Sequence, residues 1–334
     1  MKKLLINLPD GFFRAELLKE RFADIERHYE VRRVTCDFPA QIAKDLDWPD
    51  AILMWGWPTL GPAEFALARN LKMLAQINSN RTTVTNAIKH GVALSEARHA
   101  WSPSVSEMAL ALMLAGLRRT SDFHRKMRLG EDAGIWINDF PVDIDPTERQ
   151  LTGRTVGIVG LGAIGRRLAE LLAPFHVELL VNDPFLSAET CAKYGAASAD
   201  MDEICRRCDV VVLCAANTPE AEKTLSAKRI DMLRKNAVLV NVGRAMLVDM
   251  DALAQRLAKG DLVAMLDVFD NEPLEKDSPF RTLPNTYLSP HRAGGIYESV
   301  YRALDWLRAD IDAFFAGGER KYAVTAGMEH CFSE

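Results

Sequence analysis

The feature that most constrains the fold is a glycine pattern set between a strand-like run and a helix-like run. Residues 160–165 read Gly-Leu-Gly-Ala-Ile-Gly, directly after the apolar run Thr155–Val159 and at the start of an apolar-periodic stretch. In that context Gly160 permits a tight turn, Gly162 lets the backbone approach a pyrophosphate, and Gly165 lets helix and strand pack closely. The helix N-terminus then offers N–H groups and a favourable dipole to phosphates. The pattern predicts a dinucleotide-binding unit.

The end of the next expected strand indicates which dinucleotide binds. The run Val177–Asn182 is followed by Asp183, which lies 183 − 165 = 18 residues after Gly165. A ribose-binding carboxylate is expected about 20 residues after the motif. Such a carboxylate accepts hydrogen bonds from the ribose hydroxyls and repels a 2′-phosphate, and no Arg follows it directly. We therefore expect NAD(H) as the cofactor, with NADP less favoured.

Strand-like and helix-like runs alternate along the whole chain, which predicts an α/β protein with doubly wound parallel sheets. In the first third we expect strands at Leu4–Asn7, Ala51–Trp55, Lys72–Ile77 and Val92–Leu94, with helices at Gly11–Phe22 and Ala63–Asn70. In the second series we expect strands at Thr155–Val159, Val177–Asn182, Asp209–Leu213, Ala237–Val242, Leu262–Val268 and Thr286–Ser289. A long amphipathic helix is expected over Gly295–Ala316.

Two segments connect these series. Ser104 and Glu107 have capping-box spacing, so a helix is expected from Met108 to Leu117, and its apolar surface predicts deep burial. Residues 130–150 are rich in Asp, Pro and Gly and show little periodicity, which is typical of a surface excursion.

Length and composition exclude several classes of protein. The chain has 334 residues with 48% hydrophobic and 26% charged residues, which fits two globular domains. A net charge of −5 without a long basic block argues against nucleic-acid binding. The first apolar run stops at Asn7 and Pro9, too early for a secretion signal, and no apolar stretch approaches the roughly 20 residues that cross a bilayer. We expect a cytoplasmic protein with no membrane contact.

Cys205 and Cys208 form a C-x-x-C pair without a second pair at zinc-site spacing, so we expect no metal site. The alternative to a redox pair is two small side chains that pack a helix against a strand, and unpaired cysteines fit a reducing compartment.

Three polar residues follow neighbouring expected strands. Arg244 comes after the strand that ends at Val242, Glu272 after Val268, and His291 after Ser289. Ligands bind outside the carboxyl ends of parallel strands, so these side chains are expected beside the nucleotide. An Arg can hold a carboxylate by two parallel hydrogen bonds, and a His can exchange a proton with a carbonyl oxygen. A carboxylate beside the His fixes its tautomer and raises its pKa.

Each residue has an ordinary alternative role: a surface Arg, a solvated loop Glu, or a His that satisfies a loop backbone. Their common sheet edge and the adjacent glycine motif favour hydride transfer to a small 2-keto acid, with the hydride carried by the cofactor.

The same three segments carry a resemblance to a known family. Residues 241–245 (Asn-Val-Gly-Arg-Ala), 266–273 (Leu-Asp-Val-Phe-Asp-Asn-Glu-Pro) and 288–295 (Leu-Ser-Pro-His-Arg-Ala-Gly-Gly) resemble the catalytic segments of the D-isomer-specific 2-hydroxyacid dehydrogenases, which include glyoxylate/hydroxypyruvate reductases and phosphoglycerate dehydrogenases. The resemblance covers nearly the whole chain. It implies that Arg244 binds the substrate and that His291, supported by Glu272, is the acid/base.

The resemblance also implies an architecture. Residues 1–100 and 293–334 would form a smaller flavodoxin-like substrate domain, residues 101–292 a Rossmann NAD-binding domain, and the active site would lie in a cleft between them. Members of the family are commonly homodimers joined through their nucleotide domains. Expected cofactor contacts are Gly160, Gly162, Ala163, Ile164, Gly165, Asp183, Ala215, Ala216, Thr218, Val242, Gly243, Asp267 and Gly294. Expected substrate contacts are Ser79, Asn80, Arg81, Arg244 and His291.

This chain departs from the family pattern in the first third. The family has a Gly-rich turn whose N–H groups bind the substrate carboxylate, whereas residues 78–83 here read Asn-Ser-Asn-Arg-Thr-Thr. Asn tolerates a left-handed backbone, so Asn78 or Asn80 can preserve such a turn. If Arg81 points inward, it favours a second acidic group on the substrate; if outward, it is a solvated side chain.

Two other departures concern aromatic and small residues. Trp55-Gly56-Trp57-Pro58 replaces small polar residues, giving either a bulkier apolar pocket wall or a packing contact. Cys214-Ala215-Ala216 replaces a frequent His-x-Pro run and can loosen cofactor contacts.

Two alternative functions stay open. Formate-oxidising relatives pair the His with a Gln, and Glu272 argues against that chemistry. A cofactor-binding corepressor-like sensor without turnover can retain all three catalytic residues. The chain ends soon after its long final helix, so we expect no appended regulatory domain.

Overall fold

The computed structural model describes residues 1–131, 134–329 and 332. The chain divides into two compact units. Unit 1 comprises Met1–Trp101 and Tyr297–Glu334, and unit 2 is the continuous segment Ser102–Ile296. The last residues of unit 2 include Ala293, whose N–H donates to the Asp267 carboxylate at 2.9 Å.

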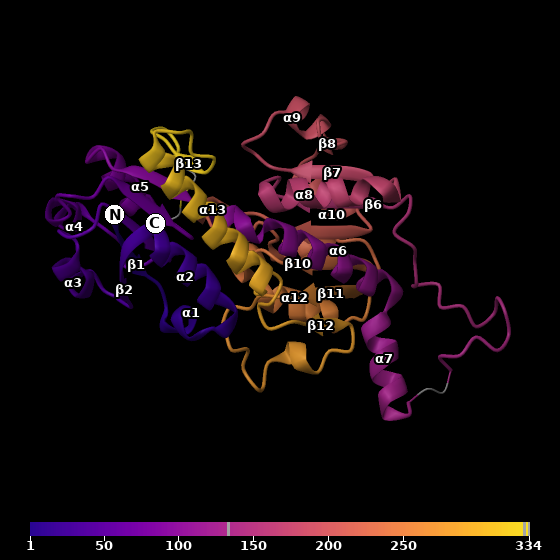
Figure 1. Ribbon diagram of the computed structural model, residues 1–334. Helices are drawn as coiled ribbons and strands as arrows, with labels where there is room; N and C mark the ends of the chain where they lie inside the picture. The colour runs from indigo at the N-terminus through magenta and orange to yellow at the C-terminus, as the bar shows by residue number, and fades with distance from the viewer. Residues whose placement is uncertain (132–133, 330–331, 333–334) are drawn as a thin grey trace. The chain divides into compact units, whose positions relative to one another are not determined.

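The described part of unit 1 contains a sheet in the order β13-β5-β4-β3-β1-β2, parallel except for β13 (Figure 1). Its strands are β1 (Lys2–Asn7), β2 (Tyr29–Val34), β3 (Ala51–Met54), β4 (Met73–Gln76), β5 (Ala93–Glu96) and β13 (Ala323–Val324). Its α-helices are α1 (Asp10–Arg14), α2 (Lys19–His28), α3 (Pro39–Ile42), α4 (Pro62–Leu67), α5 (Arg81–Lys89) and α13 (Tyr297–Ala316).

Both faces of this sheet are buried, as the alternation of side chains along β1 illustrates. Leu4 and Ile6 belong to a core shared with α2 and α13, whereas Leu5 belongs to a second core on the other face with residues of α4 and α5. Because strand side chains alternate in direction, a strand covered on both faces must be apolar throughout. This explains the continuous apolar runs of the sequence.

In unit 2 the described strands form an all-parallel sheet in the order β12-β11-β10-β9-β6-β7-β8. They are β6 (Thr155–Val159), β7 (Glu178–Asn182), β8 (Ala196–Ser198), β9 (Val210–Leu213), β10 (Ala237–Asn241), β11 (Leu262–Leu266) and β12 (Thr286–Leu288). The α-helices are α6 (Ser102–Arg118), α7 (Thr120–Leu129), α8 (Ala163–Leu172), α9 (Ala188–Ala192), α10 (Met201–Arg207), α11 (Ala227–Met232) and α12 (Met250–Leu257). The strand order reverses between β6 and β9, which confirms the doubly wound fold of the sequence prediction.

Helix α6 is the segment that comes closest to a membrane span. Residues 98–118 are long and apolar enough to cross a bilayer, so the expectation that no stretch approaches that length was wrong. In the structure 56% of the most apolar window is buried, and α6 packs against α8, β10 and β11 within unit 2. The apolar side chains of α6 are therefore explained by packing in the core of unit 2.

Some local predictions were also wrong. Helix α6 begins at Ser102, so Ser104 lies inside it and forms no capping box; Ser106 Oγ instead donates to the Pro103 carbonyl at 2.8 Å. The helix expected over 11–22 is interrupted at Ala15, which adopts an extended backbone with ψ 115°. Strands β2, β8 and β13 were not predicted.

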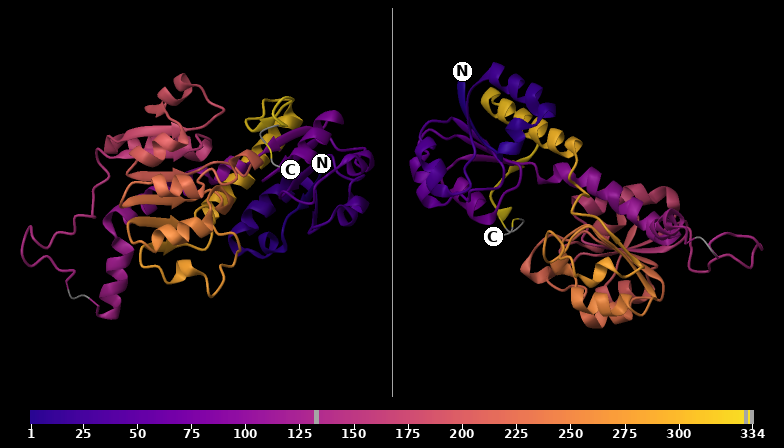
Figure 2. Two further views of the ribbon diagram at one scale, coloured as in Figure 1. Left: turned by 180° about the vertical axis from the view of Figure 1, so that it is seen from behind. Right: turned by 90° about the horizontal axis from the view of Figure 1, so that it is seen from below.

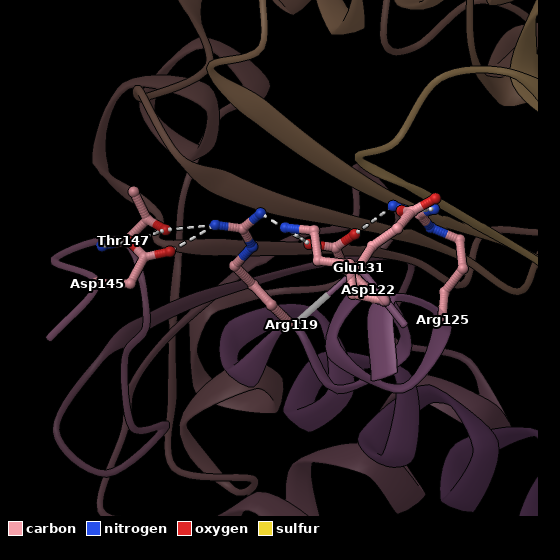
Figure 3. Close-up of polar contacts among 7 residues, drawn as sticks. Arg119, Asp122, Arg125, Glu131, Asp145 and Thr147 are labelled. Atoms are coloured by element: carbon pink, nitrogen blue, oxygen red, sulfur yellow. Dashed lines mark hydrogen bonds and ion pairs between the residues drawn. The ribbon is translucent and has the colours of Figure 1, made fainter. Parts of the chain in front are cut away.

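Residues 131 and 134–150 form an excursion that extends from the sheet of unit 2 (Figures 1 and 2). Ion pairs tie it to α7, as Figure 3 shows. Arg119 contacts Asp145 Oδ2 at 2.5 Å and Asp122 Oδ2 at 3.0 Å, and Arg125 contacts Glu131 Oε2 at 3.1 Å. The expected surface excursion is thus present, and a polar network holds its two ends.

Cys205 and Cys208 lie fully buried in the unit 2 core, which supports the packing interpretation. Burial raises the pKa of the Cys205 thiol to about 11 and of the Cys208 thiol to about 12. Such thiols stay protonated and unreactive near neutral pH. Among the described residues no group of His, Cys, Asp and Glu is placed to hold a metal ion.

Candidate active site

The glycine motif lies at the switch point of the unit 2 sheet, where β6 leads into α8. Gly160 has φ +90°, and a Cβ built on it would lie 2.6 Å from the Ala215 Cα. A Cβ on Gly165 would lie 2.3 Å from the Gly160 carbonyl oxygen. A Cβ on Gly162 would meet nothing within 4 Å, so open space lies in front of this residue. Two glycines are thus required by the turn, and the third leaves room for a ligand.

Helix α8 begins at Ala163, followed by Ile164, and its N-cap residue is Gly162. No side chain accepts a hydrogen bond from the N–H groups at this end of the helix. Its first N–H groups are therefore available to phosphate oxygens. The open space, the uncapped helix and the helix dipole together fit the pyrophosphate of a dinucleotide.

Asp183 lies at the carboxyl end of β7, next to the glycine turn. Its Oδ2 accepts a hydrogen bond from the Leu161 N–H at 2.9 Å, and its Oδ1 accepts from the Phe185 N–H at 3.1 Å. These bonds fix the carboxylate beside the motif, where a ribose would lie if the motif holds the pyrophosphate.

The other expected cofactor residues follow β9, β10 and β12. Gly243 approaches the β9 loop so closely that a Cβ would lie 3.1 Å from the Leu213 oxygen and 3.3 Å from the Ala215 oxygen. Val242 and Gly294 are buried, whereas Ala216 and Thr218 lie more open in the loop after β9. The structure thus brings Gly160, Ala215 and Gly243 together at one edge.

Arg244, Glu272 and His291 follow the adjacent strands β10, β11 and β12 at the same carboxyl edge. The His291 ring lies 2.7 Å from the Glu272 carboxylate, measured between Nδ1 and Oε2. The two side chains are 48% and 37% exposed, so the pair is accessible. Because an ionised carboxylate only accepts hydrogen bonds, Nδ1 carries the proton and Nε2 is left for a ligand.

The charge on Glu272 is stabilised by its neighbours. Burial alone raises the pKa of this carboxyl, but the hydrogen bond from His291, the Phe269 N–H and the positive charge of Arg244 outweigh it and lower the pKa of Glu272 below its usual range. The Phe269 N–H donates to Oε1 at 3.1 Å. Glu272 therefore stays ionised beside the imidazole.

Asp267 was expected to contact the cofactor, and the structure gives it a second, supporting role that sequence reasoning missed. This residue is 1% exposed, and its carboxylate accepts hydrogen bonds from Ser289 Oγ at 2.5 Å and from the N–H groups of Arg292 and Ala293 at 2.9 Å each. The Asp267 carbonyl accepts from the His291 N–H at 2.9 Å. Asp267 thus holds the loop that carries His291, whose backbone has φ +52°. Its position directly after a buried strand was the available signal.

Asn241 holds the loop that carries Arg244. Its Oδ1 accepts from the Gly243 N–H at 3.1 Å, and its Nδ2 donates to the Arg244 carbonyl at 3.0 Å. The Arg244 guanidinium is exposed and donates to the Gly243 carbonyl at 2.7 Å, which leaves its other N–H groups for a ligand.

The three expected substrate contacts of the first third belong to unit 1. Ser79 Oγ donates to Gln76 Oε1 at 2.6 Å, and Asn80 is the N-cap of α5, where its Oδ1 accepts from the Thr83 N–H at 2.9 Å. The expectation of a left-handed Asn was wrong, since Asn80 has φ −125° and Asn78 has no positive φ. Arg81 Nε donates to the Phe332 carbonyl at 3.3 Å, so the C-terminal segment lies against it.

Beside this turn lies a buried carboxyl group. Glu96, at the end of β5, is 8% exposed and pairs with Arg98 at 3.4 Å. Burial raises the pKa of Glu96 to about 8, although Arg98 and two backbone N–H groups favour its charged form.

Comparisons with known proteins agree with this geometry. The family described as D-isomer specific 2-hydroxyacid dehydrogenase, NAD binding domain, matches residues 110–293. A D-3-phosphoglycerate dehydrogenase of Methanocaldococcus jannaschii is 31% identical over 70% of the chain, which spans only 43% of that protein's length. A glyoxylate reductase of Korarchaeum cryptofilum is 26% identical, with 92% of this chain and 93% of that protein covered.

The fold is also found among solved structures. A phosphoglycerate oxidoreductase from Rhizobium etli superimposes with a TM-score of 0.82 at 24% identity, covering 98% of this chain and 99% of that chain. The family match covers more than half of the chain and includes the glycine motif and the catalytic strand ends. The chain therefore belongs to the D-isomer specific 2-hydroxyacid dehydrogenases, and its unit 2 contains the NAD-binding domain of that family.

Proposed function

We propose that this protein interconverts a 2-keto acid and the corresponding D-2-hydroxy acid with NAD(H). The observation that carries the proposal is the His291–Glu272 pair, placed with Arg244 at the sheet edge that also bears the glycine motif. The nicotinamide cofactor, when bound, supplies or accepts the hydride. Gly160, Gly162, Gly165 and Asp183 would hold it.

His291 moves the proton of the reaction. In the reducing direction, protonated Nε2 donates to the keto oxygen as the carbonyl carbon gains the hydride, and it regains a proton from solvent afterwards. In the oxidising direction the neutral imidazole removes the hydroxyl proton. Glu272 stabilises the protonated ring and fixes its orientation, because its ionised carboxylate accepts from Nδ1.

Arg244 binds the substrate carboxylate. A guanidinium presents paired N–H donors that match the two oxygens of a carboxylate, and binding there polarises the adjacent carbonyl. Ser79, Asn80 and Arg81 are proposed as further substrate contacts, because they stand in the sequence where the family has its carboxylate-binding turn.

NAD(H) is favoured over NADP(H) because Asp183 would repel a 2′-phosphate. Its carboxylate is fixed by the Leu161 and Phe185 N–H groups and cannot easily turn away. This supports the preference inferred from the sequence.

A panel of 2-keto acids assayed by loss of NADH absorbance, and repeated with NADPH, tests the proposal. Turnover of at least one acid with NADH is expected, and it should be strongly reduced in His291→Asn. NADH binding by calorimetry without turnover of any acid would favour instead a cofactor sensor that does not catalyse, and would overturn the proposal.

We also infer a cytoplasmic homodimer joined through unit 2. Large apolar side chains gather on α7 and the excursion, where they are exposed: Met127, Leu129, Trp136, Ile137, Phe140, Val142 and Ile144. A pocket of about 190 Å³ lies in the same unit at the amino ends of β11 and β12, lined in part by Gly116, Met265 and Tyr287. An exposed apolar set of this size is typical of a subunit contact.

Light scattering after size exclusion measures the assembly. We expect the mass of two chains, and the mass of one chain for the double variant Phe140→Glu, Val142→Glu. Phe185→Glu is the control, because Phe185 is 80% exposed in unit 2 but lies outside the excursion. A monomeric native protein would refute the dimer without affecting the proposed chemistry.

A further inference from the structure

Two adjacent arginines near the start of α8 have different environments. Arg166 and Arg167 lie close to the positive end of the helix dipole, which disfavours a cation. Arg167 is exposed and is compensated by Glu170, with Nη1 2.8 Å from Oε2. Arg166 is half-buried, and within the described part of the chain no carboxylate pairs with it. Its charge therefore has a free energy cost that a bound anion would relieve.

Two contacts hold the Arg166 guanidinium in place. Its Nε donates to the Leu161 carbonyl at 3.0 Å, and its Cζ lies 5.5 Å from the centre of the Tyr194 ring. A guanidinium has five N–H groups, and among the described residues the four on Nη1 and Nη2 have no acceptor. These four are the paired donors with which Arg binds phosphates, and the two contacts already orient them.

The same contacts place Arg166 on the side of the glycine turn that carries Asp183. Leu161, whose carbonyl accepts from Arg166, donates its N–H to Asp183 Oδ2 at 2.9 Å. Tyr194 lies between α9 and β8, and β8 pairs with β7, the strand that ends just before Asp183 (Figure 1). Burial and then the negative charge of Asp183 raise the pKa of the Cys191 thiol in α9, so this carboxylate lies near α9 as well.

This position favours one of the phosphate groups that a dinucleotide can carry. The pyrophosphate fits the open space in front of Gly162 and the N–H groups that begin α8, which require no charged side chain. A 2′-phosphate replaces the hydrogen of the ribose hydroxyl that Asp183 would bind, so it would lie on the side of the turn where Arg166 lies. A guanidinium there offers the phosphate paired hydrogen bonds and a positive charge.

We propose that Arg166 binds the 2′-phosphate of NADP(H), which makes NADP(H) a second cofactor of this protein beside NAD(H). Asp183 repels the same phosphate, so the two residues act in opposition and NAD(H) is still bound more tightly. The inference rests on the part of the proposed function that places the ribose at Asp183. It involves only residues of unit 2 and no particular 2-keto acid.

Isothermal titration calorimetry with NADPH, NADH and two cofactor fragments tests the inference without catalysis. ADP contains the adenosine and the pyrophosphate, whereas 2′,5′-ADP carries a 2′-phosphate and a single 5′-phosphate. We expect Arg166→Gln to raise the Kd of 2′,5′-ADP and NADPH about tenfold or more, because charge-assisted hydrogen bonds are lost. The Kd of ADP and NADH should change less than about twofold, which also shows that the glycine turn is intact. Arg166→Lys, which keeps the charge, should lose less than Arg166→Gln.

The matched control is Arg167→Gln, which removes the neighbouring charge from an exposed ion pair and should leave all four Kd values unchanged. An unchanged Kd for 2′,5′-ADP in Arg166→Gln would overturn the inference. An equal loss on ADP and 2′,5′-ADP would also overturn it and would assign Arg166 to the pyrophosphate, as would a native protein that binds NADH but not NADPH exclude a second cofactor. Failure of every 2-keto acid to react would overturn the proposed reaction, while these titrations would still decide the role of Arg166.

Discussion

The carboxyl edges of the two sheets carry different chemistry. In unit 2 the edge presents Arg244, Glu272 and His291, and buried polar residues such as Asp267 hold their loops. In unit 1 the corresponding edge carries Trp55 and Trp57 after β3 and a turn without glycine after β4. The first edge matches its family, and the second departs from it. The residues of the proposed chemistry therefore all follow strands of unit 2.

The largest expected effect concerns His291. Its backbone has φ +52°, which Asn adopts more easily than Ala, so His291→Asn removes the imidazole without adding strain. We expect kcat to fall about a thousandfold, since general acid–base catalysis contributes at this scale, with NADH affinity unchanged. His176→Asn is the control, because His176 also has φ +51° in unit 2. Lost NADH binding in His291→Asn would contradict the assigned role.

Arg244→Lys comes next. The charge is retained but the paired donors are lost, so kcat/KM should fall about a hundredfold on every 2-keto acid, whatever its side chain. An exposed arginine of α10, Arg206, whose ion pair is to Asp202 of the same helix, provides the control variant Arg206→Lys. A loss confined to one class of 2-keto acid would contradict this role, because every substrate of the proposed reaction carries the carboxylate.

Asp183→Asn tests which cofactor the unit 2 edge prefers. The amide oxygen can still accept from the Leu161 N–H, so the change removes mainly the negative charge. We expect the preference for NADH over NADPH, measured as a ratio of kcat/KM values, to decrease about tenfold because repulsion of the 2′-phosphate is relieved. An unchanged ratio would show that Asp183 does not face the ribose.

The smallest effect concerns stability. Burial raises the pKa of Glu96 to about 8, so between its ordinary value and pH 8 the folded state binds a proton that the unfolded state has released. Stability should therefore fall as pH rises through this window and level off above it. Melting temperatures from pH 5 to pH 9 should decline less in Glu96→Gln than in the native protein. Glu20→Gln, at an exposed position, should follow the native profile.

Six of the seven described strands of unit 2 were predicted to within a few residues, because buried parallel strands are continuous apolar runs. Strand β2 was missed because it lies at a sheet edge and carries charged residues, and β8 is only three residues long. The break at Ala15 could not be predicted, since nothing in an alanine forces an extended backbone.

The three catalytic candidates could be found from strand ends alone, since adjacent parallel strands bring their carboxyl ends together. The supporting residues could not. Asp267 holds the His291 loop through bonds to residues more than 20 positions away, which only the folded chain brings near. Asn80 was misassigned because asparagine suits both a left-handed turn and a helix N-cap, and the sequence does not distinguish them.

The division of the chain has a consequence for its synthesis. The unit 1 core contains Leu4 and Ile6 together with Ala303, Leu307 and Ile311 of α13. Unit 2 occupies everything from Ser102 to Ile296, so the ribosome makes it between the two parts of unit 1. At roughly 5–20 residues per second, the first part waits about 10 to 40 seconds for its missing helix. Unit 2 can complete its sheet first, while the apolar strands of unit 1 are the surface that a chaperone would meet on the nascent chain.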